Sequence, residues 1–250
     1  MMSARFSRFA PATPDLLEAR ALLRRVDTKF VVPVAALDAL VDPIVGAYAA
    51  LQVPTGVLAL YQSTYFDTDD LRCFHDHRRG RRPRHKVRIR HYPDRGVSFL
   101  EVKTKRSEEV TIKRRLAVPF GDERLGEREH GFLLEVLGPW AEALRPQLVV
   151  RFRRLSLIGV AHQERVTIDL ELSSDGAPEV ERRLGALAVV EVKQSPYSVR
   201  TPVMRSLQAI GARERSLSKY ATSLALARPD LRQNRLRPEL RALERMHRRG

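Results

Sequence analysis

The feature that most constrains the fold is a set of short segments in which apolar and charged residues alternate. In residues 165–172, Arg-Val-Thr-Ile-Asp-Leu-Glu-Leu, every second residue is apolar and every intervening one is polar. Because side chains along a β-strand point to opposite faces in turn, this pattern is typical of a strand with one apolar and one charged face. Residues 86–90, 100–105, 111–115 and 189–193 share it. The pattern predicts a sheet with one charged face.

A charged sheet face has two interpretations. A single strand of this kind is most simply half-buried, with its polar side in water. Five such strands that mix Lys or Arg with Asp or Glu in the same rows favour a closed barrel around a wet, charged interior. Helices would then cover the outer, apolar face of the barrel.

The remaining pattern supports the second interpretation. Many short strands at close spacing, with few long helices between them, are typical of an antiparallel α+β fold. The expected fold class is therefore α+β: an antiparallel β-barrel of about eight strands that forms a charged tunnel, with flanking helices. The predicted strands are residues 29–34, 58–66, 85–92, 97–105, 110–118, 148–158, 163–172 and 186–193, and the predicted helices are residues 15–25, 35–41, 69–78, 131–144, 201–210 and 238–249.

The charge of the chain indicates a polyanionic partner. The 250 residues hold 45 Lys and Arg against 30 Asp and Glu, a net charge of +15. Most of the excess lies in two segments: residues 72–95 contain ten Lys or Arg and two Asp, and residues 228–250 contain eight Arg and three acids. Nucleic acid, an acidic membrane surface or a phosphate-rich small molecule would match this charge. For the C-terminal segment, solvated surface arginines are the simpler interpretation.

Several other classes have little support. Cys73 is the only cysteine, which excludes an internal disulfide framework or a Cys-rich zinc module and favours a reducing compartment. The most apolar stretch, residues 44–60, is interrupted by Gln52 and Pro54 and is too short to span a membrane, and the first 15 residues lack the apolar run of a signal peptide. The expected location is the cytoplasm, and association with a membrane through a partner protein is left open.

Motifs for other chemistries are weak. Cys73, His75 and His77 have metal-like spacing but no fourth ligand nearby, so surface histidines are the simpler interpretation. Neither a P-loop nor a dinucleotide-binding glycine motif occurs. Ser195 and Ser198 lack a nucleophile elbow and a partner histidine. Catalysis by a side-chain nucleophile is not expected.

A charged interior of this kind suits a chain of phosphates. The planar guanidinium of Arg binds phosphate oxygens through two N–H groups at once, and Lys adds a point charge. Carboxylates would not bind phosphate directly, but their oxygens suit Mg²⁺ or Mn²⁺, which bridge to phosphate oxygens. Phosphoryl transfer needs little beyond such positioning and charge neutralisation.

Six motifs in a fixed order carry a resemblance to a known family. They are Arg25-Val-Asp-Thr-Lys-Phe30, Tyr65-Phe-Asp-Thr68, Lys86-Val-Arg-Ile-Arg-His-Tyr92, Phe99-Leu-Glu-Val-Lys103, Glu191-Val-Lys-Gln194 and Leu217-Ser-Lys-Tyr220. This set resembles the VTC (vacuolar transporter chaperone) domain of polyphosphate polymerases, which belongs to the triphosphate tunnel metalloenzymes. The resemblance implies a tunnel domain over residues 1–226, followed by a basic, helical tail over residues 227–250.

The resemblance also implies roles for single residues inside the tunnel. Those expected to act on the phosphates in catalysis are Arg88, Arg90, Lys103 and Lys219. Those expected to bind substrate are Lys29, Lys86, Lys113, Arg114, Arg154 and Arg165. Those expected to hold metal are Glu191 and, with the alternative that they orient Lys and Arg instead, Asp169 and Glu101. Strand parity leaves Arg153 or Arg154 as the inward residue, and Arg154 is preferred because it is in phase with Ser156.

The implied activity is transfer of the terminal phosphate of ATP to a polyphosphate chain, with Mn²⁺ or Mg²⁺ as cofactor. Tunnel hydrolases often begin with Glu-x-Glu-x-Lys, and the same spacing here reads Arg25-x-Asp27-x-Lys29, which favours the polymerase branch. The expected partners are ATP or another triphosphate and polyphosphate, with nucleic acid bound only non-specifically; a membrane-protein partner is left open. The alternatives are a metal-dependent tripolyphosphate or nucleoside-triphosphate hydrolase, or a protein that binds polyphosphate or nucleic acid without turnover.

Overall fold

The protein is built around one large, curved sheet. The computed structural model describes residues 5–20, 25–107 and 110–248. The ends of the eight longest strands differ from the predicted ones by at most three residues, and the antiparallel α+β class is confirmed. The strands are β1 (Ala10–Pro11), β2 (Val26–Pro33), β3 (Tyr48–Ala50), β4 (Leu58–Asp67), β5 (Arg84–Tyr92), β6 (Val97–Lys105), β7 (Thr111–Val118), β8 (Arg145–Gly159), β9 (Glu164–Ser174) and β10 (Leu187–Gln194).

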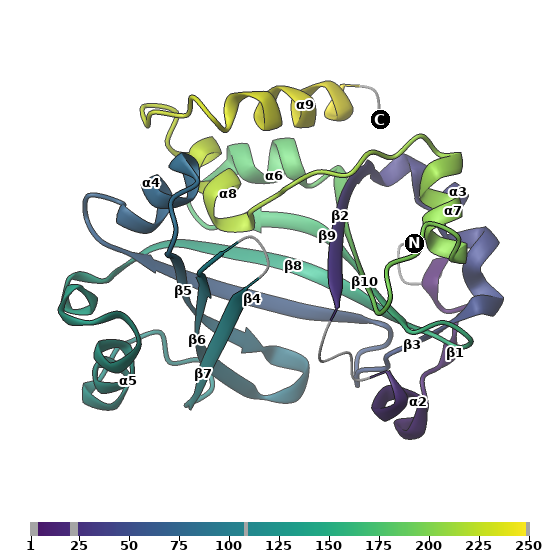
Figure 1. Ribbon diagram of the computed structural model, residues 1–250, viewed down its shortest axis with the longest axis horizontal. Coiled ribbons are helices and arrows are strands. Elements are labelled where there is room, and N and C mark those ends of the chain that lie inside the picture. Colours follow the sequence, from purple (N-terminus) through teal and green to yellow (C-terminus); the bar gives the residue numbers. More distant parts are fainter. Residues whose placement is uncertain (1–4, 21–24, 108–109, 249–250) are drawn as a thin grey trace.

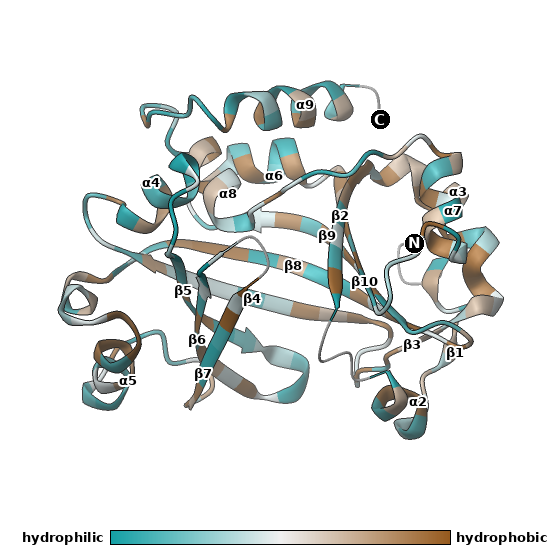
Figure 2. Ribbon diagram, in the orientation of Figure 1, coloured by the Kyte–Doolittle hydropathy of each residue, from teal (hydrophilic) through white to brown (hydrophobic). Residues whose placement is uncertain are grey.

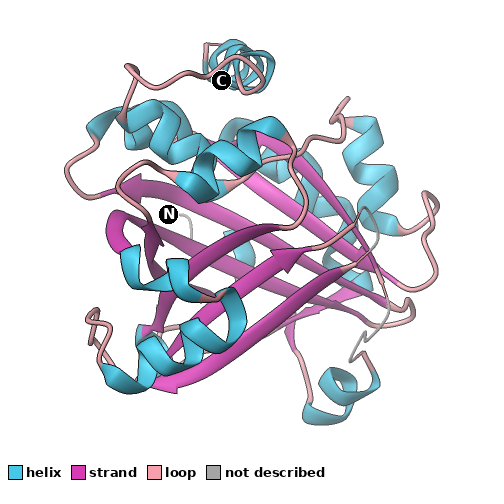
Figure 3. Ribbon diagram, turned by 60° about the vertical axis from the view of Figure 1, so that its left-hand side comes forward, coloured by secondary structure: helices cyan, strands magenta, loops and turns pink. Residues whose placement is uncertain are grey.

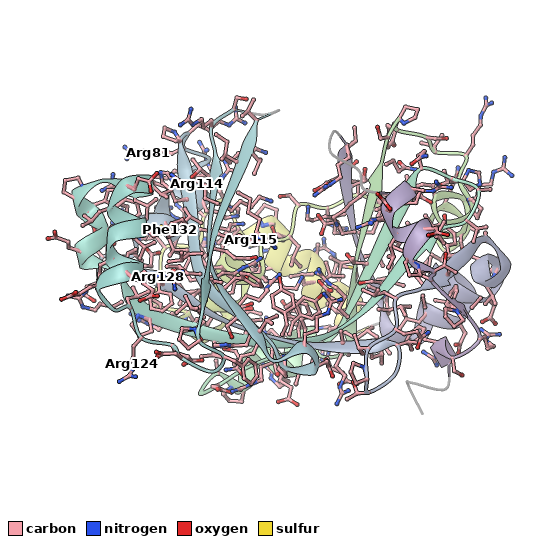
Figure 4. All side chains as sticks on the ribbon, turned by 90° about the horizontal axis from the view of Figure 1, so that it is seen from below. Arg81, Arg114, Arg115, Arg124, Arg128 and Phe132 are labelled. Carbon is pink, nitrogen blue, oxygen red and sulfur yellow. The ribbon has the colours of Figure 1, made fainter. Side chains whose placement is uncertain are left out.

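The sheet is not closed into a barrel. Its strands follow the order β2-β10-β9-β8-β4-β5-β6-β7 with antiparallel neighbours throughout, while β3 pairs with β8, and β1 adds to β3 in parallel. Within the described residues no ladder joins β2 to β7, so the expected closure is not observed, and the sheet curls around a concave face that is open on one side (Figure 4). Cations on β2 and on β5–β7 point to this face, and like charges on facing strands disfavour pairing.

Helices lie on both sides of the sheet (Figure 3). The predicted helix over residues 131–144 is split, because Gly138 and Pro139 end α5 and start a 3₁₀ turn. No helix in the described ranges is long and apolar enough to span a membrane. The helices are α2 (Pro14–Ala19), α3 (Leu37–Val41), α4 (Arg72–Arg79), α5 (Glu127–Leu137), α6 (Pro178–Leu184), α7 (Pro202–Ala209), α8 (Lys219–Ala227) and α9 (Arg237–His247), with 3₁₀ turns η1 (Val34–Ala36), η2 (Asp42–Ala47), η3 (Pro93–Arg95) and η4 (Pro139–Ala143).

Helices cover the convex, apolar face of the sheet, as the alternating pattern predicts. The alternation is visible along β8 in Figure 2. Under α3 and α7, buried apolar side chains of β2, β8, β9 and β10 form one core, in which Ile168 and Val190 are fully buried. Under α5 and η4, side chains of β5 and β6 such as Ile89 and Leu100 form a second core. These two cores account for the apolar faces of β5, β6, β9 and β10, whereas residues 111–115 of β7 are exposed.

A third core lies on the concave face. Helices α4, α6, α8 and α9 pack there against Val31, Val189 and Val150, and α6, α8 and α9 lie together beside the sheet (Figure 1). They cover only the apolar end of that face. The remainder carries the charged side chains, and we call it the cationic face; its members named below are Lys29, Arg84, Lys86, Arg88, Arg90, Glu101, Lys103, Lys113, Arg115, Arg154, Arg165, Asp169, Glu191, Lys193 and Lys219.

Candidate functional site

Strands β2 and β10 supply one wall of the cationic face. Their register sets Lys29 opposite Glu191, and the Lys29 Nζ lies 3.1 Å from Oε1 of Glu191. Lys193, two residues further along β10, places its Nζ 3.0 Å from Oε2 of the same carboxylate. Burial opposes ionisation of Glu191, but the charges of Lys193 and Lys29 outweigh it and hold the pKa of Glu191 well below its usual range.

Asp169 on β9 links two cations from different elements. Arg154 on β8 donates from Nε and Nη2 to its two oxygens at 2.5 and 2.8 Å, and Lys219 Nζ lies 2.5 Å from Oδ2. Arg153 points to the convex side and pairs with Glu171, so the preference for Arg154 as the inward residue is confirmed. Burial would raise the pKa of Asp169, but Arg154 and Lys219 outweigh it and lower the pKa well below the ordinary value.

A third ion cluster lies on β5, β6 and β7. Arg88 donates from Nε and Nη2 to Oε2 of Glu101 at 2.8 and 2.7 Å and from Nη1 to the Tyr65 hydroxyl at 3.2 Å. Lys113 pairs with the other oxygen of Glu101. Burial opposes the charge of Glu101, but Arg88 and Arg90 outweigh it, and the pKa of Glu101 falls to about 2. The fork of Arg88 is thereby fixed, while both of its Nη atoms keep N–H groups for another ligand.

Helix α8 delivers Lys219 to the cationic face. Ser218 caps the helix by accepting a hydrogen bond from Ala221 N at 3.3 Å, so Lys219 is its first residue. Tyr220 donates to Oδ2 of the buried Asp67 at 2.6 Å. Asp67 also accepts from Cys73 N and Phe74 N, at the start of α4. This one carboxylate therefore fixes both helices against β4, which explains why the Tyr65–Thr68 and Leu217–Tyr220 motifs belong together.

Aromatic rings form the floor beneath the cations. The Arg90 guanidinium lies 5.4 Å from the ring centroid of Tyr61 and 5.6 Å from that of Phe152. Arg154 and Lys219 also lie over the Phe152 ring, at 5.3 and 4.7 Å. Ring faces attract cations, so this floor offsets part of their mutual repulsion without occupying their hydrogen-bond donors.

Two further lysines of the cationic face, Lys86 and Lys103, form a facing pair. They lie directly opposite each other on β5 and β6, and neither forms an ion pair within the part of the chain that the structure describes. Burial lowers the pKa of Lys86, and the neighbouring charges of Lys103 and Arg84 lower it further, to about 7. Burial and the charge of Lys29 also lower the pKa of Lys103, although Glu191 and Asp27 on the same facing wall oppose the shift. The pair is arranged to receive an anion.

Replacing Lys86 with Met is expected to stabilise the protein most at pH values below about 7. The folded-state pKa of Lys86 lies below the ordinary value of 10.5, so between these two pH values the unfolded chain binds more protons than the folded one. The destabilisation that comes from burying the charged lysine therefore becomes smaller as the pH rises through this interval. Denaturant unfolding of wild type and K86M across that interval measures the difference. The exposed convex-side variant R153M is the control and should show no such trend. A K86M difference that is constant with pH would contradict the assignment.

Arg114 does not lie on the cationic face. It pairs with Glu135 of α5 at 2.7 Å and lies over the Phe132 ring, on the convex side. Its neighbour Arg115 points to the concave side, where it lies over Phe99 (Figure 4). The register sets Lys113 opposite Lys103 and Arg115 opposite Glu101. Adjacent residues of a strand face opposite ways, so the expected placement of Lys113 and Arg114 on one face is corrected.

Arg165 lies at the margin of the cationic face. Its strand position sets it opposite Lys193, but its Nη2 donates to the carbonyl oxygen of Leu17 in α2 at 2.6 Å. Arg165 therefore also fixes the N-terminal helix. The other predicted site residues, apart from Arg114, are brought together: Lys29, Lys86, Arg88, Arg90, Glu101, Lys103, Lys113, Arg154, Asp169, Glu191 and Lys219.

Three members of the cationic face were missed by the sequence-based prediction. Arg84 extends the β5 row beyond Lys86, and Lys193 follows Glu191 on β10. Arg115 follows Lys113 on β7. A strict two-residue period, continued in both directions from the residues already chosen, finds all three.

The carboxylates of the cationic face fit a single metal ligand better than a metal cluster. Among the described residues, no three His, Cys, Asp or Glu side chains gather as a metal-binding group. Asp169 and Glu101 each accept both N–H groups of an arginine fork, whereas Glu191 meets only lysines. Mg²⁺ commonly binds through one or two carboxylates together with substrate phosphates. Glu191 has the chemistry for that role.

Residues 24–228 match the family model of the VTC domain. The chain belongs to the VTC domain family. No curated protein matches it.

Several solved structures are similar to this chain, and one of them, the first below, supports the fold. A putative adenylyl cyclase from Hippeastrum, described as having a dominant triphosphatase activity, is 17% identical, with a TM-score of 0.55 over 80% of this chain and 94% of that chain. A putative adenylate cyclase from Vibrio parahaemolyticus is 11% identical, with a TM-score of 0.48 over 81% and 99%. One from Bacillus halodurans is 13% identical, with a TM-score of 0.48 over 78% and 94%.

Proposed function

We propose that this protein transfers the terminal phosphate of ATP to a polyphosphate chain on its cationic face, with Mn²⁺ or Mg²⁺ as cofactor. The observation that carries the proposal is the excess of cations on one concave face, above all the facing lysines Lys86 and Lys103, which form no ion pair with the residues that the structure describes. Lys29 on the opposite wall and Arg88 beside them would hold successive phosphates.

The reaction asks little of the side chains except position and charge. A terminal oxygen of the acceptor chain forms a bond to the γ-phosphorus of ATP, the bond to the β–γ bridging oxygen breaks, and ADP leaves. Arg88, Arg90, Lys103 and Lys219 would neutralise the charge on the transferred group, and Lys29, Arg154, Lys113 and Arg165 would hold the flanking phosphates. Glu191 would hold a divalent cation, which would supply positive charge to neutralise the phosphates.

The choice of acceptor follows from the carboxylates. Because cations lower the pKa values of Glu101, Asp169 and Glu191, these groups are weak bases. A polyphosphate end is already an anion and needs no base, whereas water gains from one. Asp169 and Glu101 would then act as positioning residues for Arg154 and Arg88.

The replacement E191Q is expected to reduce metal-dependent turnover by about 100-fold and to raise the metal concentration needed for half-maximal rate. Purified protein is incubated with ATP, Mn²⁺ or Mg²⁺ and a short polyphosphate primer, and rates are followed over a metal titration. The exposed convex-side variant E171Q is the matched control. An E191Q protein with wild-type turnover and metal dependence would contradict the metal assignment, and a thermal melt separates this effect from loss of folding.

The same incubation tests the proposed activity. Resolving products by gel, alongside release of free phosphate, distinguishes the acceptors. Long polymer is the expected product. Free phosphate without polymer would instead make the protein a tunnel hydrolase, the second candidate, which the triphosphatase activity in the description of the Hippeastrum protein favours. If neither product forms while polyphosphate still binds, the protein is a binding module or lacks a partner.

We further propose that the protein acts in the cytoplasm and that any membrane association is through a partner protein. Nucleic acid would bind only through its phosphates, weakly and in a salt-dependent way. Loss of nucleic-acid binding at physiological salt, with polyphosphate binding retained, is the expected result.

A further inference from the structure

A second group of cations lies outside the cationic face. It is formed by Arg78 and Arg79 at the end of α4, Arg81 after it, and Arg232 and Arg235 in the segment before α9. Arg79, Arg81, Arg232 and Arg235 are exposed, and Arg78 is half-buried. We call these five residues the α4–α9 patch.

The two segments of the α4–α9 patch are held together although they are far apart in sequence. Arg235 Nη1 donates to the carbonyl oxygen of Arg79 at 2.5 Å. Burial lowers the pKa of Arg78, and so do the charges of Arg79, Arg232 and Arg235. The α4–α9 patch is therefore a true cluster in space, in which like charges are held close together.

The α4–α9 patch continues the row of cations that leaves the cationic face along β5. That row runs from Arg88 through Lys86 to Arg84. His77, in the last turn of α4, is the link: burial lowers its pKa to about 3, and Lys86 and Arg84 are the next largest causes. The residue after it is Arg78. A polyanion leaving Lys86 along β5 would thus pass Arg84 and the uncharged His77 before it meets the cations of the α4–α9 patch.

The composition of the α4–α9 patch favours a simple phosphate chain over other polyanions. It contains no aromatic side chain on which bases would stack. The apolar side of α9, including Leu236 and Leu243, packs into the protein core and is not available to lipid. One carboxylate contacts the patch by an ion pair within the described residues: Asp76, 3.6 Å from Arg81.

We propose that the α4–α9 patch binds the segment of a linear polyphosphate that extends beyond the cationic face. This inference rests on the proposed function, since the polymer is its product. The patch would hold a chain that is already too long for the cationic face, so it acts on long polymer and not on the triphosphate. Its role would be to keep the growing chain attached between successive additions.

The double replacement R79E/R232E tests this inference. Neither side chain forms a hydrogen bond or ion pair among the described contacts, so the fold should tolerate it. Binding of end-labelled long-chain polyphosphate and of tripolyphosphate is measured by fluorescence anisotropy over a salt series. Long-chain affinity is expected to fall by about tenfold with a shallower salt dependence, while tripolyphosphate affinity stays within twofold. In the turnover assay, the polymers made by the variant should be shorter.

The matched control is R124E/R128E, which makes the same change of charge just before α5 and in its first turn (Figure 4). It should leave long-chain affinity within twofold. An equal loss in both variants would overturn the inference, because net charge alone would explain it. Unchanged long-chain binding, or a loss confined to anionic vesicles or single-stranded nucleic acid, would also overturn it. If wild type makes no polymer but the length-selective loss occurs, the site stands and the proposed transferase activity fails.

Discussion

The variant R88M is expected to synthesise polymer about 10³-fold more slowly, because a positioned arginine mainly stabilises the charge that develops during phosphoryl transfer. Arg88 is held by Glu101 on one side and Tyr65 on the other, so its fork is fixed before substrate arrives. R88K keeps the charge but loses the fork, and we expect it to fall between wild type and R88M. Gel analysis of polymer and release of ADP measure the three rates.

R153M is the control for R88M. It removes an arginine from the convex side, where the side chain pairs with an exposed glutamate, and should retain wild-type synthesis. R88M also removes one of the cations that hold Glu101, which then keeps its ion pair with Lys113. The double variant R88M/E101Q therefore shows whether synthesis falls because the Arg88 cation is lost or because the Glu101 carboxylate moves. Near-wild-type synthesis by R88M would remove Arg88 from the reaction.

The variant D169N is expected to lower the free energy of unfolding by about 3–5 kcal/mol, the usual cost of removing one partner from a buried ion pair. Asp169 is 2% exposed and is the carboxylate that holds both Arg154 and Lys219. Because its folded-state pKa lies below its ordinary value of 3.8, its contribution is present above pH 3.8 and is lost as pH falls toward the folded-state value. Denaturant unfolding measures the difference.

E171Q is again the matched control, since the Glu171–Arg153 pair is exposed on both sides and should contribute about 0–1 kcal/mol. Saturating tripolyphosphate should restore part of the stability lost in D169N, because phosphate oxygens would replace the missing counter-ion. A D169N protein as stable as E171Q would show that the ion cluster contributes no net stability. A stabilisation by tripolyphosphate that is no larger in D169N than in E171Q would contradict a specific replacement at this position.

The alternating pattern predicted most of the site because the two-residue period of a β-strand determines both the sequence pattern and which side chains share a face. Residues two apart on a strand share a face, so the rows Lys86–Arg88–Arg90 and Glu101–Lys103 followed from the sequence once one member was placed. The same rule decides between Arg114 and Arg115, whose adjacent positions cannot share a face. Choosing Lys113 and Arg114 together was inconsistent with it.

Other features depend on interactions that a strand pattern does not contain. Helix α8 was not predicted because its residues are apolar on nearly every side, which removes the amphipathic period of a surface helix. The pairing of Asp169 with Arg154 and Lys219 joins three elements that are distant in sequence. The predicted closure of the sheet into a barrel is not observed. Closure depends on whether the last strand pairs with the first, and the alternating pattern is the same in an open and in a closed sheet.

An open sheet leaves unpaired backbone groups along its edge strands, and such edges readily add a strand from another molecule. The edge of β2 is partly covered, because Arg215 N donates to the Lys29 carbonyl oxygen at 2.8 Å and Phe30 forms a bridge with Glu214. Strand β7 carries three consecutive cations, Lys113 to Arg115, and β2 ends at Pro33, which has no amide hydrogen to donate. Charge and proline are the usual protections against edge-to-edge aggregation. The basic residues of β7 therefore oppose the addition of a strand at this edge, and neutralising them together is expected to promote self-association as well as change the site.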